Sequence, residues 1–119
     1  MKRALILFAH GSRDPQWARP FERLAALLSK RVDTAVVLAY LEQMKPSLGE
    51  AIDALAKEKI DAVRIVPLFF GTGGHIAEDL PRLVGAARAK HRSLQIDIDA
   101  PIGEQDAVLS AIAKAIADR

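Results

Sequence analysis

Residues 66–81, VPLFFGTGGHIAEDLP, contain the pattern that decides the fold. An apolar segment runs into a glycine-rich turn, and a helical pattern begins directly after His75. Residues 5–13, LILFAHGSR, repeat this arrangement, with a strand pattern that ends at His10 and Gly11. In an open α/β sheet the carboxyl ends of the strands are where ligands bind. We therefore expect both histidines to lie at one edge of a sheet.

Strand and helix patterns alternate along the whole chain. The apolar spacing predicts strands at residues 2–9, 35–41, 61–70 and 94–98, the last of them a one-sided edge strand. Helices are predicted over about 15–31, from Pro46–Ser47 to residues 57–59, and over about 76–91 and 104–118, with residues 101–103 as a loop. This order, βαβαβαβα, predicts an α/β fold: one doubly wound, four-stranded parallel sheet with flavodoxin-like layering, a single domain over residues 1–119.

Composition excludes several classes of function. The chain has 119 residues and no cysteine, so disulfides, thiolate metal sites and cysteine nucleophiles are excluded. The net charge of +2 and the lack of a basic, aromatic patch argue against a nucleic-acid partner. No apolar segment reaches the length of a membrane span or a signal peptide, so we expect a cytoplasmic protein. Four strands make a small sheet, which favours a homodimer.

The loops that follow the strands are expected to form one crevice. They contain His10, Glu42, His75 and the glycines at 71, 73 and 74. Two imidazoles and a carboxylate suit a borderline divalent metal, and the glycines leave room for a wide ligand.

Other interpretations of these loops remain open. The histidines could be structural, Glu42 could be a solvated loop acid, and the glycine-rich turn could hold an anion at a helix N-terminus. That turn nevertheless fits neither the P-loop nor the dinucleotide motif. A serine hydrolase would need Gly-x-Ser-x-Gly, and a receiver domain would need acidic residues after the first strand; both patterns are absent.

These motifs resemble those of the small CbiX-type sirohydrochlorin chelatases, cobaltochelatases or ferrochelatases of the class II chelatase family. The resemblance covers essentially the whole chain. It is most specific in three segments: LFAHGSR at 7–13, YLE to KPSL at 40–48, and VPLF through GGH to DLP at 66–81.

The resemblance implies an enzyme that inserts Co²⁺, Fe²⁺ or Ni²⁺ into sirohydrochlorin without ATP, on the way to siroheme or cobalamin. The metal would be a substrate, no cofactor would be tightly bound, and the short chains are expected to pair as homodimers. The family's two metal-binding histidines fall on His10 and His75, and its strand-end acid falls on Glu42. The expected substrate-binding residues are Ser12, Arg13, Lys45, Gly71, Thr72, Gly73 and Gly74. Ala77 departs from the family pattern, which has a basic residue there in many relatives.

The chemistry expected of this site is metal insertion with His10, His75 and Glu42 as catalytic residues. The two histidines would hold the ion, and one imidazole or Glu42 would accept the pyrrole protons. A tetrapyrrole or metal carrier would use the same histidines without turnover. A purely structural α/β domain would bind no metal at all.

Overall fold

The computed structural model describes residues 1–71 and 73–119, with all their side chains except that of His75. Strands and helices alternate as the sequence predicts. The elements are β1 (Arg3–Ala9), the 3₁₀ turn η1 (Pro15–Ala18), α1 (Arg19–Ser29), β2 (Ala35–Tyr40), α2 (Leu48–Lys57), β3 (Ala62–Pro67), α3 (His75–Lys90), β4 (Gln95–Ile98), the 3₁₀ turn η2 (Ile102–Glu104) and α4 (Asp106–Ala117).

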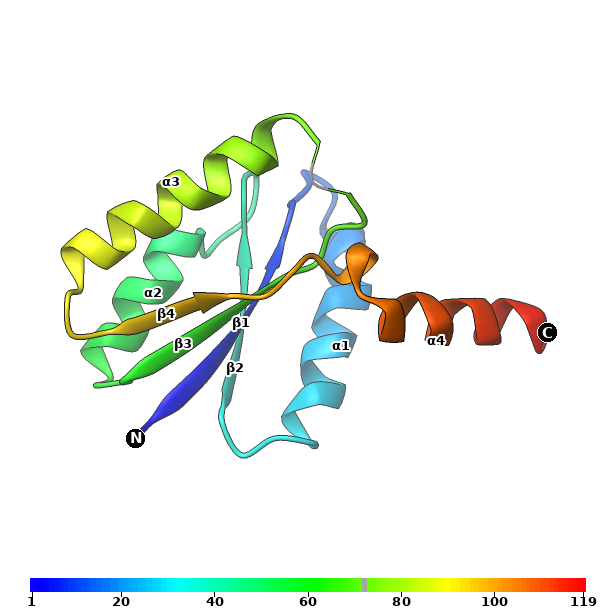
Figure 1. The fold of residues 1–119 in the computed structure, drawn as a ribbon, viewed down its shortest axis with the longest axis horizontal. Helices are drawn as coiled ribbons and strands as arrows, with labels where there is room; N and C mark the ends of the chain where they lie inside the picture. Colours follow the sequence, from blue (N-terminus) through cyan, green and yellow to red (C-terminus); the bar gives the residue numbers. More distant parts are fainter. Residues whose placement is uncertain (72) are drawn as a thin grey trace.

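All four strands are parallel and form one sheet in the order β2-β1-β3-β4 (Figure 1). β1 pairs on both sides, with Ile6 opposite Val37 of β2 and Ile65 of β3. β4 pairs with β3 at the edge of the sheet, as its alternating pattern predicts. The predicted α/β fold class is confirmed. Because the strands are parallel, the connections that follow them emerge at one edge.

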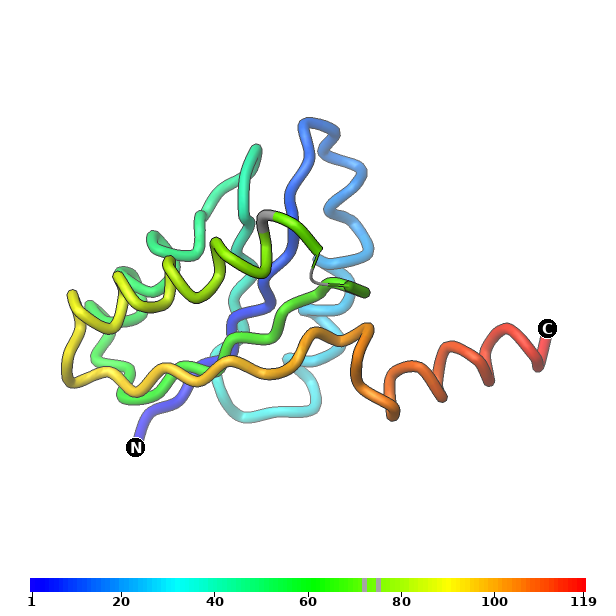
Figure 2. Tube along the Cα trace, turned by 45° about the horizontal axis from the view of Figure 1, so that its top comes forward, coloured from blue at the N-terminus to red at the C-terminus, as the bar shows by residue number. Residues whose placement is uncertain are grey.

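Helices cover both faces of this sheet. α2 and α3 lie side by side on one face (Figures 1 and 2), where the core contains Ile6, Phe8, Ile52, Ile65 and Val84. α1 lies on the other face, over β1 and β2, and its apolar stripe packs on the strands. The second core contains Leu7, Ala9, Tyr40 and Leu68, with Trp17, Phe21, Ala25 and Leu28 against them.

Local sequence signals explain where two of the helical segments begin. Ser47 and Glu50 form a capping box at the start of α2: the Ser47 hydroxyl accepts from the Glu50 amide, and the Glu50 carboxylate accepts from the Ser47 amide. These hydrogen bonds hold the pKa of Glu50 below its usual value. Asp14 caps η1 by accepting from the Gln16 amide, and Pro15 follows in the first turn.

Three predicted boundaries are wrong in detail. The helix expected over 15–31 is split into η1 and α1, because Pro20 has no amide proton and therefore fits only the first turn of an α-helix. The third strand ends at Pro67 instead of residue 70, and Phe70 is 64% exposed. The expected loop at 101–103 contains η2, which is closed by a hydrogen bond from the Glu104 amide to the Pro101 carbonyl.

The position of α4 is set by the tertiary structure. The helix extends away from the sheet instead of packing on it (Figures 1 and 2), and none of its residues is buried. Its apolar side chains are consequently open to solvent, with Leu109 42% and Ile116 72% exposed. Among the described residues, no helix combines the length and hydrophobicity that crossing a bilayer requires.

Candidate functional site

The loops after β1 and β2 are held side by side by backbone hydrogen bonds. The Leu41 amide donates to the Ala9 carbonyl at 2.9 Å, and the Glu42 amide donates to the His10 carbonyl at 3.0 Å. Pairing thus continues past the ends of the two strands, which places His10 beside Glu42.

Gly11 makes this close approach possible. Its φ is +98°, a conformation that favours glycine, and a Cβ added there would lie 1.8 Å from the carbonyl oxygen of Glu42. A side chain at position 11 would therefore force the two loops apart. The glycine after His10 is a structural requirement of the His10–Glu42 pair.

His10 and Glu42 face each other at the carboxyl edge of the sheet. The His10 Nε2 lies 3.5 Å from Glu42 Oε1, and the two side chains are 49% and 54% exposed. The other ring nitrogen, Nδ1, lies 3.2 Å from the Gly11 carbonyl oxygen. Because a carbonyl only accepts, this contact favours the tautomer with the proton on Nδ1. That tautomer leaves the Nε2 lone pair free to coordinate a metal.

The separation of these two atoms suits a shared metal ion. Typical bonds of about 2.1 Å to an imidazole nitrogen and to a carboxylate oxygen, across this 3.5 Å separation, subtend about 113° at the metal. This angle is near tetrahedral. His10 and Glu42 can therefore hold one ion together, and their exposure leaves its other coordination positions open.

A cavity of about 540 Å³ lies directly against this pair. It is lined by His10, Leu41, Glu42, Gly73, Gly74, Ile76, Asp79, Arg82 and Leu83. The structure thus brings four of the predicted site residues together: His10, Glu42, Gly73 and Gly74. The lining combines apolar side chains with a few convergent polar groups, as small-molecule sites do.

His75 is the first residue of α3, directly after the cavity-lining Gly74. Gly74 has φ +59° and ψ −126°, a conformation that strains residues with a side chain. The turn thus delivers His75 to the start of a helix beside the cavity. Its side chain lies outside the described residues, so its role as a ligand stays a prediction. Among the described side chains, no cluster of three His, Cys, Asp or Glu residues could hold a metal.

Four further predicted substrate-binding residues are described by the structure and are not part of the cavity lining: Ser12, Arg13, Lys45 and Gly71. The Arg13 Nε donates to the Gln43 side chain at 3.3 Å, and the Ser12 hydroxyl accepts from the Asp14 amide at 3.1 Å. Lys45 and Gly71 are exposed. Thr72 lies outside the described residues.

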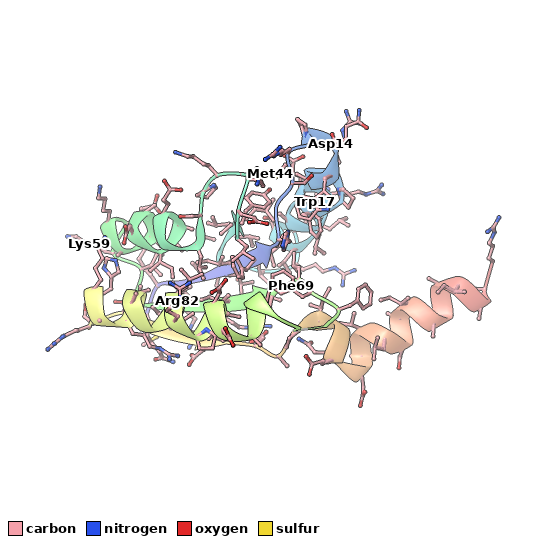
Figure 3. The ribbon with its side chains drawn as sticks, turned by 90° about the horizontal axis from the view of Figure 1, so that it is seen from above. Asp14, Trp17, Met44, Lys59, Phe69 and Arg82 are labelled. Carbon is pink, nitrogen blue, oxygen red and sulfur yellow. The ribbon has the colours of Figure 1, made fainter. Side chains whose placement is uncertain are left out.

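Asp79 and Arg82 are cavity residues that our sequence analysis missed. They form an ion pair at 2.9 Å within α3, and the Arg82 side chain is 71% exposed. Figure 3 looks down on this edge of the sheet and shows Arg82 on α3, across from Met44 and Asp14. The spacing was the available signal: residues 75, 79 and 82 are i, i+4 and i+7, which share one helical face.

The fold is similar to solved chelatase structures. A CbiX protein from Marinobacter aquaeolei matches with a TM-score of 0.86 and 30% identity, over 98% of this chain and 95% of that one. SirB, a sirohydrochlorin chelatase from Bacillus subtilis in complex with cobalt, matches with a TM-score of 0.84 and 24% identity. That match covers 99% of this chain and 51% of SirB, so the chain spans about half of SirB's length.

Sequence relatives carry a consistent name. A sirohydrochlorin cobaltochelatase from Saccharolobus solfataricus is 33% identical over 94% of this chain and 91% of its own length. A second, from Methanosarcina barkeri, is 29% identical over 81% of this chain and 75% of its own length. The CbiX family model matches residues 4–119. Because that match spans both strand-end histidines and nearly all of the alternating fold, this chain belongs to the CbiX family.

Proposed function

We propose that this protein inserts a divalent metal ion, Co²⁺ in the first place, into sirohydrochlorin without ATP. The observation that carries the proposal is the His10–Glu42 pair, 3.5 Å apart and open to a cavity at the carboxyl edge of the sheet. Membership of the CbiX family and relatives named sirohydrochlorin cobaltochelatase support it.

The metal is a substrate in this reaction and must be held loosely. His10 Nε2 and one Glu42 oxygen bind it, and the His75 imidazole supplies a third ligand from the start of α3. Both described ligands are about half exposed, so solvent completes the coordination until pyrrole nitrogens replace it. Imidazole and carboxylate ligands also accept Fe²⁺ and Ni²⁺, which makes these ions the alternative substrates.

Each insertion releases two protons from pyrrole nitrogens as two metal–nitrogen bonds form. A base next to the metal must accept them. Glu42 suits this role because its second carboxylate oxygen remains free when the first binds the metal. As the macrocycle takes over the ion, the Glu42 oxygen or an imidazole nitrogen released from it accepts a proton and passes it to solvent.

Substrate recognition depends on the carboxylates that surround the macrocycle. Arg82 is the best-placed anchor, because it lines the cavity and its planar guanidinium can pair with a carboxylate through two hydrogen bonds. Arg13, Lys45 and Ser12 act as outer anchors on the opposite rim. Gly73 and Gly74 leave space for the edge of the macrocycle, and Leu41, Ile76 and Leu83 provide apolar contacts. We assign Gly71 and Thr72 to the same substrate contact as predicted from the sequence.

We further propose that residues 1–119 form a single domain and that the protein acts in the cytoplasm as a homodimer, in siroheme or cobalamin synthesis. It carries no tightly bound cofactor. The small four-stranded sheet and the uncovered apolar face of α4 support the dimer.

The decisive experiment is an anaerobic assay with sirohydrochlorin and Co²⁺, Fe²⁺ or Ni²⁺, in which absorption of the macrocycle is followed against a sample without protein. We expect many turnovers with Co²⁺ and loss of activity in His10→Ala and His75→Ala. His91→Ala, at the far end of α3, is the matched control and should retain activity. An absorption change that stops at one equivalent would instead identify a carrier.

A further inference from the structure

The cavity beside the His10–Glu42 pair has one fixed positive charge. Among the described residues that line it, the charged side chains are Glu42, Asp79 and Arg82. Glu42 faces His10 at 3.5 Å, whereas the Arg82 Nη2 donates to Asp79 Oδ1 at 2.9 Å. The proposed anchor for a substrate carboxylate is therefore already paired with a carboxylate of the protein.

Neither helix capping nor metal binding accounts for Asp79. It is the fifth residue of α3, a helix without a side-chain cap, and it lies beyond the first turn, where a carboxylate gains most from the helix dipole. Among the described side chains, it joins no cluster of three that could hold a metal. Its side chain is 32% exposed and hydrogen-bonded to Arg82. The bond to Arg82 is therefore the feature of Asp79 that points to a role.

The Asp79–Arg82 pair has the properties of a contact that a ligand can replace. The Arg82 side chain is 71% exposed, and among the described residues its guanidinium makes this single hydrogen bond. A guanidinium has five N–H donors, so a free carboxylate can approach it through two parallel bonds. An exposed ion pair of this kind shifts an equilibrium by up to about fivefold. An incoming carboxylate can therefore take Arg82 from Asp79.

We propose that Asp79 is a positioning residue that competes with the substrate's carboxylates for Arg82. In the free protein Asp79 holds the guanidinium at the cavity, and in the complex a carboxylate of the macrocycle replaces Asp79 as its partner. This inference rests on the sirohydrochlorin chelatase proposed above and describes how its substrate is held and released. Binding therefore includes the cost of breaking the Asp79–Arg82 pair, which lowers the affinity.

The same competition acts on the product. Metal insertion changes the centre of the macrocycle and leaves the carboxylates at its edge unchanged, so Arg82 binds substrate and product alike. Such uniform binding does not accelerate the chemical step, and a tightly held product slows each turnover. When Asp79 pairs with Arg82 again, it shortens the time for which the product stays bound. Its removal should therefore act mainly on the dissociation rate.

Equilibrium binding of metal-free sirohydrochlorin, followed anaerobically by its absorption, tests the competition without any turnover. Asp79→Asn should lower the Kd about fivefold, because Arg82 is then free before the substrate arrives. Asp79→Glu restores the competing carboxylate and should reverse this change. Glu78→Gln is the matched control: it removes the same charge from an exposed neighbour outside the cavity lining and should leave the Kd unchanged. An unchanged or raised Kd in Asp79→Asn overturns the inference.

A double variant separates competition for Arg82 from simple charge repulsion. In the Arg82→Gln background, Asp79→Asn should no longer lower the Kd; a gain that persists there would show that Asp79 only repels the substrate, and would overturn the inference. A wild-type protein that binds sirohydrochlorin and shows these shifts but inserts no metal would contradict the chelatase alone. A protein that inserts metal with a Kd indifferent to Asp79→Asn would contradict the inference alone. A wild-type protein that does not bind sirohydrochlorin would contradict both.

Discussion

Gly11→Ala should separate the loops after β1 and β2, which carry the proposed site. The added Cβ would lie 1.8 Å from the Glu42 carbonyl oxygen, whereas an ordinary C···O contact is about 3.3 Å. The loops must therefore move apart by about 1.5 Å. That movement breaks the hydrogen bond from the Glu42 amide to the His10 carbonyl and displaces both proposed metal ligands, His10 and Glu42.

Two effects determine the loss of stability. A side chain at φ +98° costs about 1–2 kcal/mol, and each lost backbone hydrogen bond costs about 1 kcal/mol. The free energy of unfolding should fall by about 2–4 kcal/mol, which corresponds to a melting temperature about 10 °C lower. Metal insertion should suffer more, because a misplacement of about 1 Å can lower the rate about 100-fold.

Thermal unfolding by circular dichroism and the anaerobic insertion assay measure the two effects separately. Gly49→Ala is the matched control: Gly49 lies in α2, no atom is within 4 Å of an added Cβ, and alanine should stabilise the helix by up to about 1 kcal/mol. If Gly11→Ala keeps wild-type stability and activity while Gly49→Ala behaves as expected, the proposed closeness of the two loops is wrong.

Three further variants test the site and the electrostatics. Glu42→Gln removes the carboxylate that we propose binds the metal and accepts protons, so kcat should fall about 100-fold. The exposed Glu58→Gln is its control, and a fully active Glu42→Gln variant would show that another group is the base. Arg82→Gln should raise KM for sirohydrochlorin about tenfold with little change in kcat, because it removes a proposed contact to the edge of the substrate. An unchanged KM would show that Arg82 does not contact the substrate. Hydrogen bonds from His91 and Lys90 lower the pKa of Asp53 in the folded protein. The ionised Asp53 carboxylate therefore stabilises the fold at pH values above its unfolded pKa of about 3.9. This stabilisation is lost as the pH falls through the lower pKa of the folded state. Asp53→Asn should consequently lower the melting temperature at pH 7 and lower it less at acidic pH. A difference in melting temperature between wild type and variant that stays constant with pH would refute this linkage.

Most of the fold could be predicted from local patterns. Alternation of strand and helix signals predicted a parallel sheet, and parallel strands place every following loop at one edge. This is why the sequence alone assigns His10, Glu42 and the glycines at 73 and 74 to one site. Helical spacing also contained the signal for Asp79 and Arg82, which share a face with His75.

The sequence by itself determined the order of the elements, the edge of the sheet that carries the site and the residue types available there. Those properties follow from periodicity and chain direction, which are local. Only the tertiary structure decided that Gly11 lies against the Glu42 carbonyl and that α4 leaves the sheet. Both depend on contacts between segments distant in sequence: β1 with β2 in the first case, and the turn at Gly103 with the end of β3 in the second. An apolar helical face shows that a helix must be covered, but the surface that covers it is set by how the other elements pack.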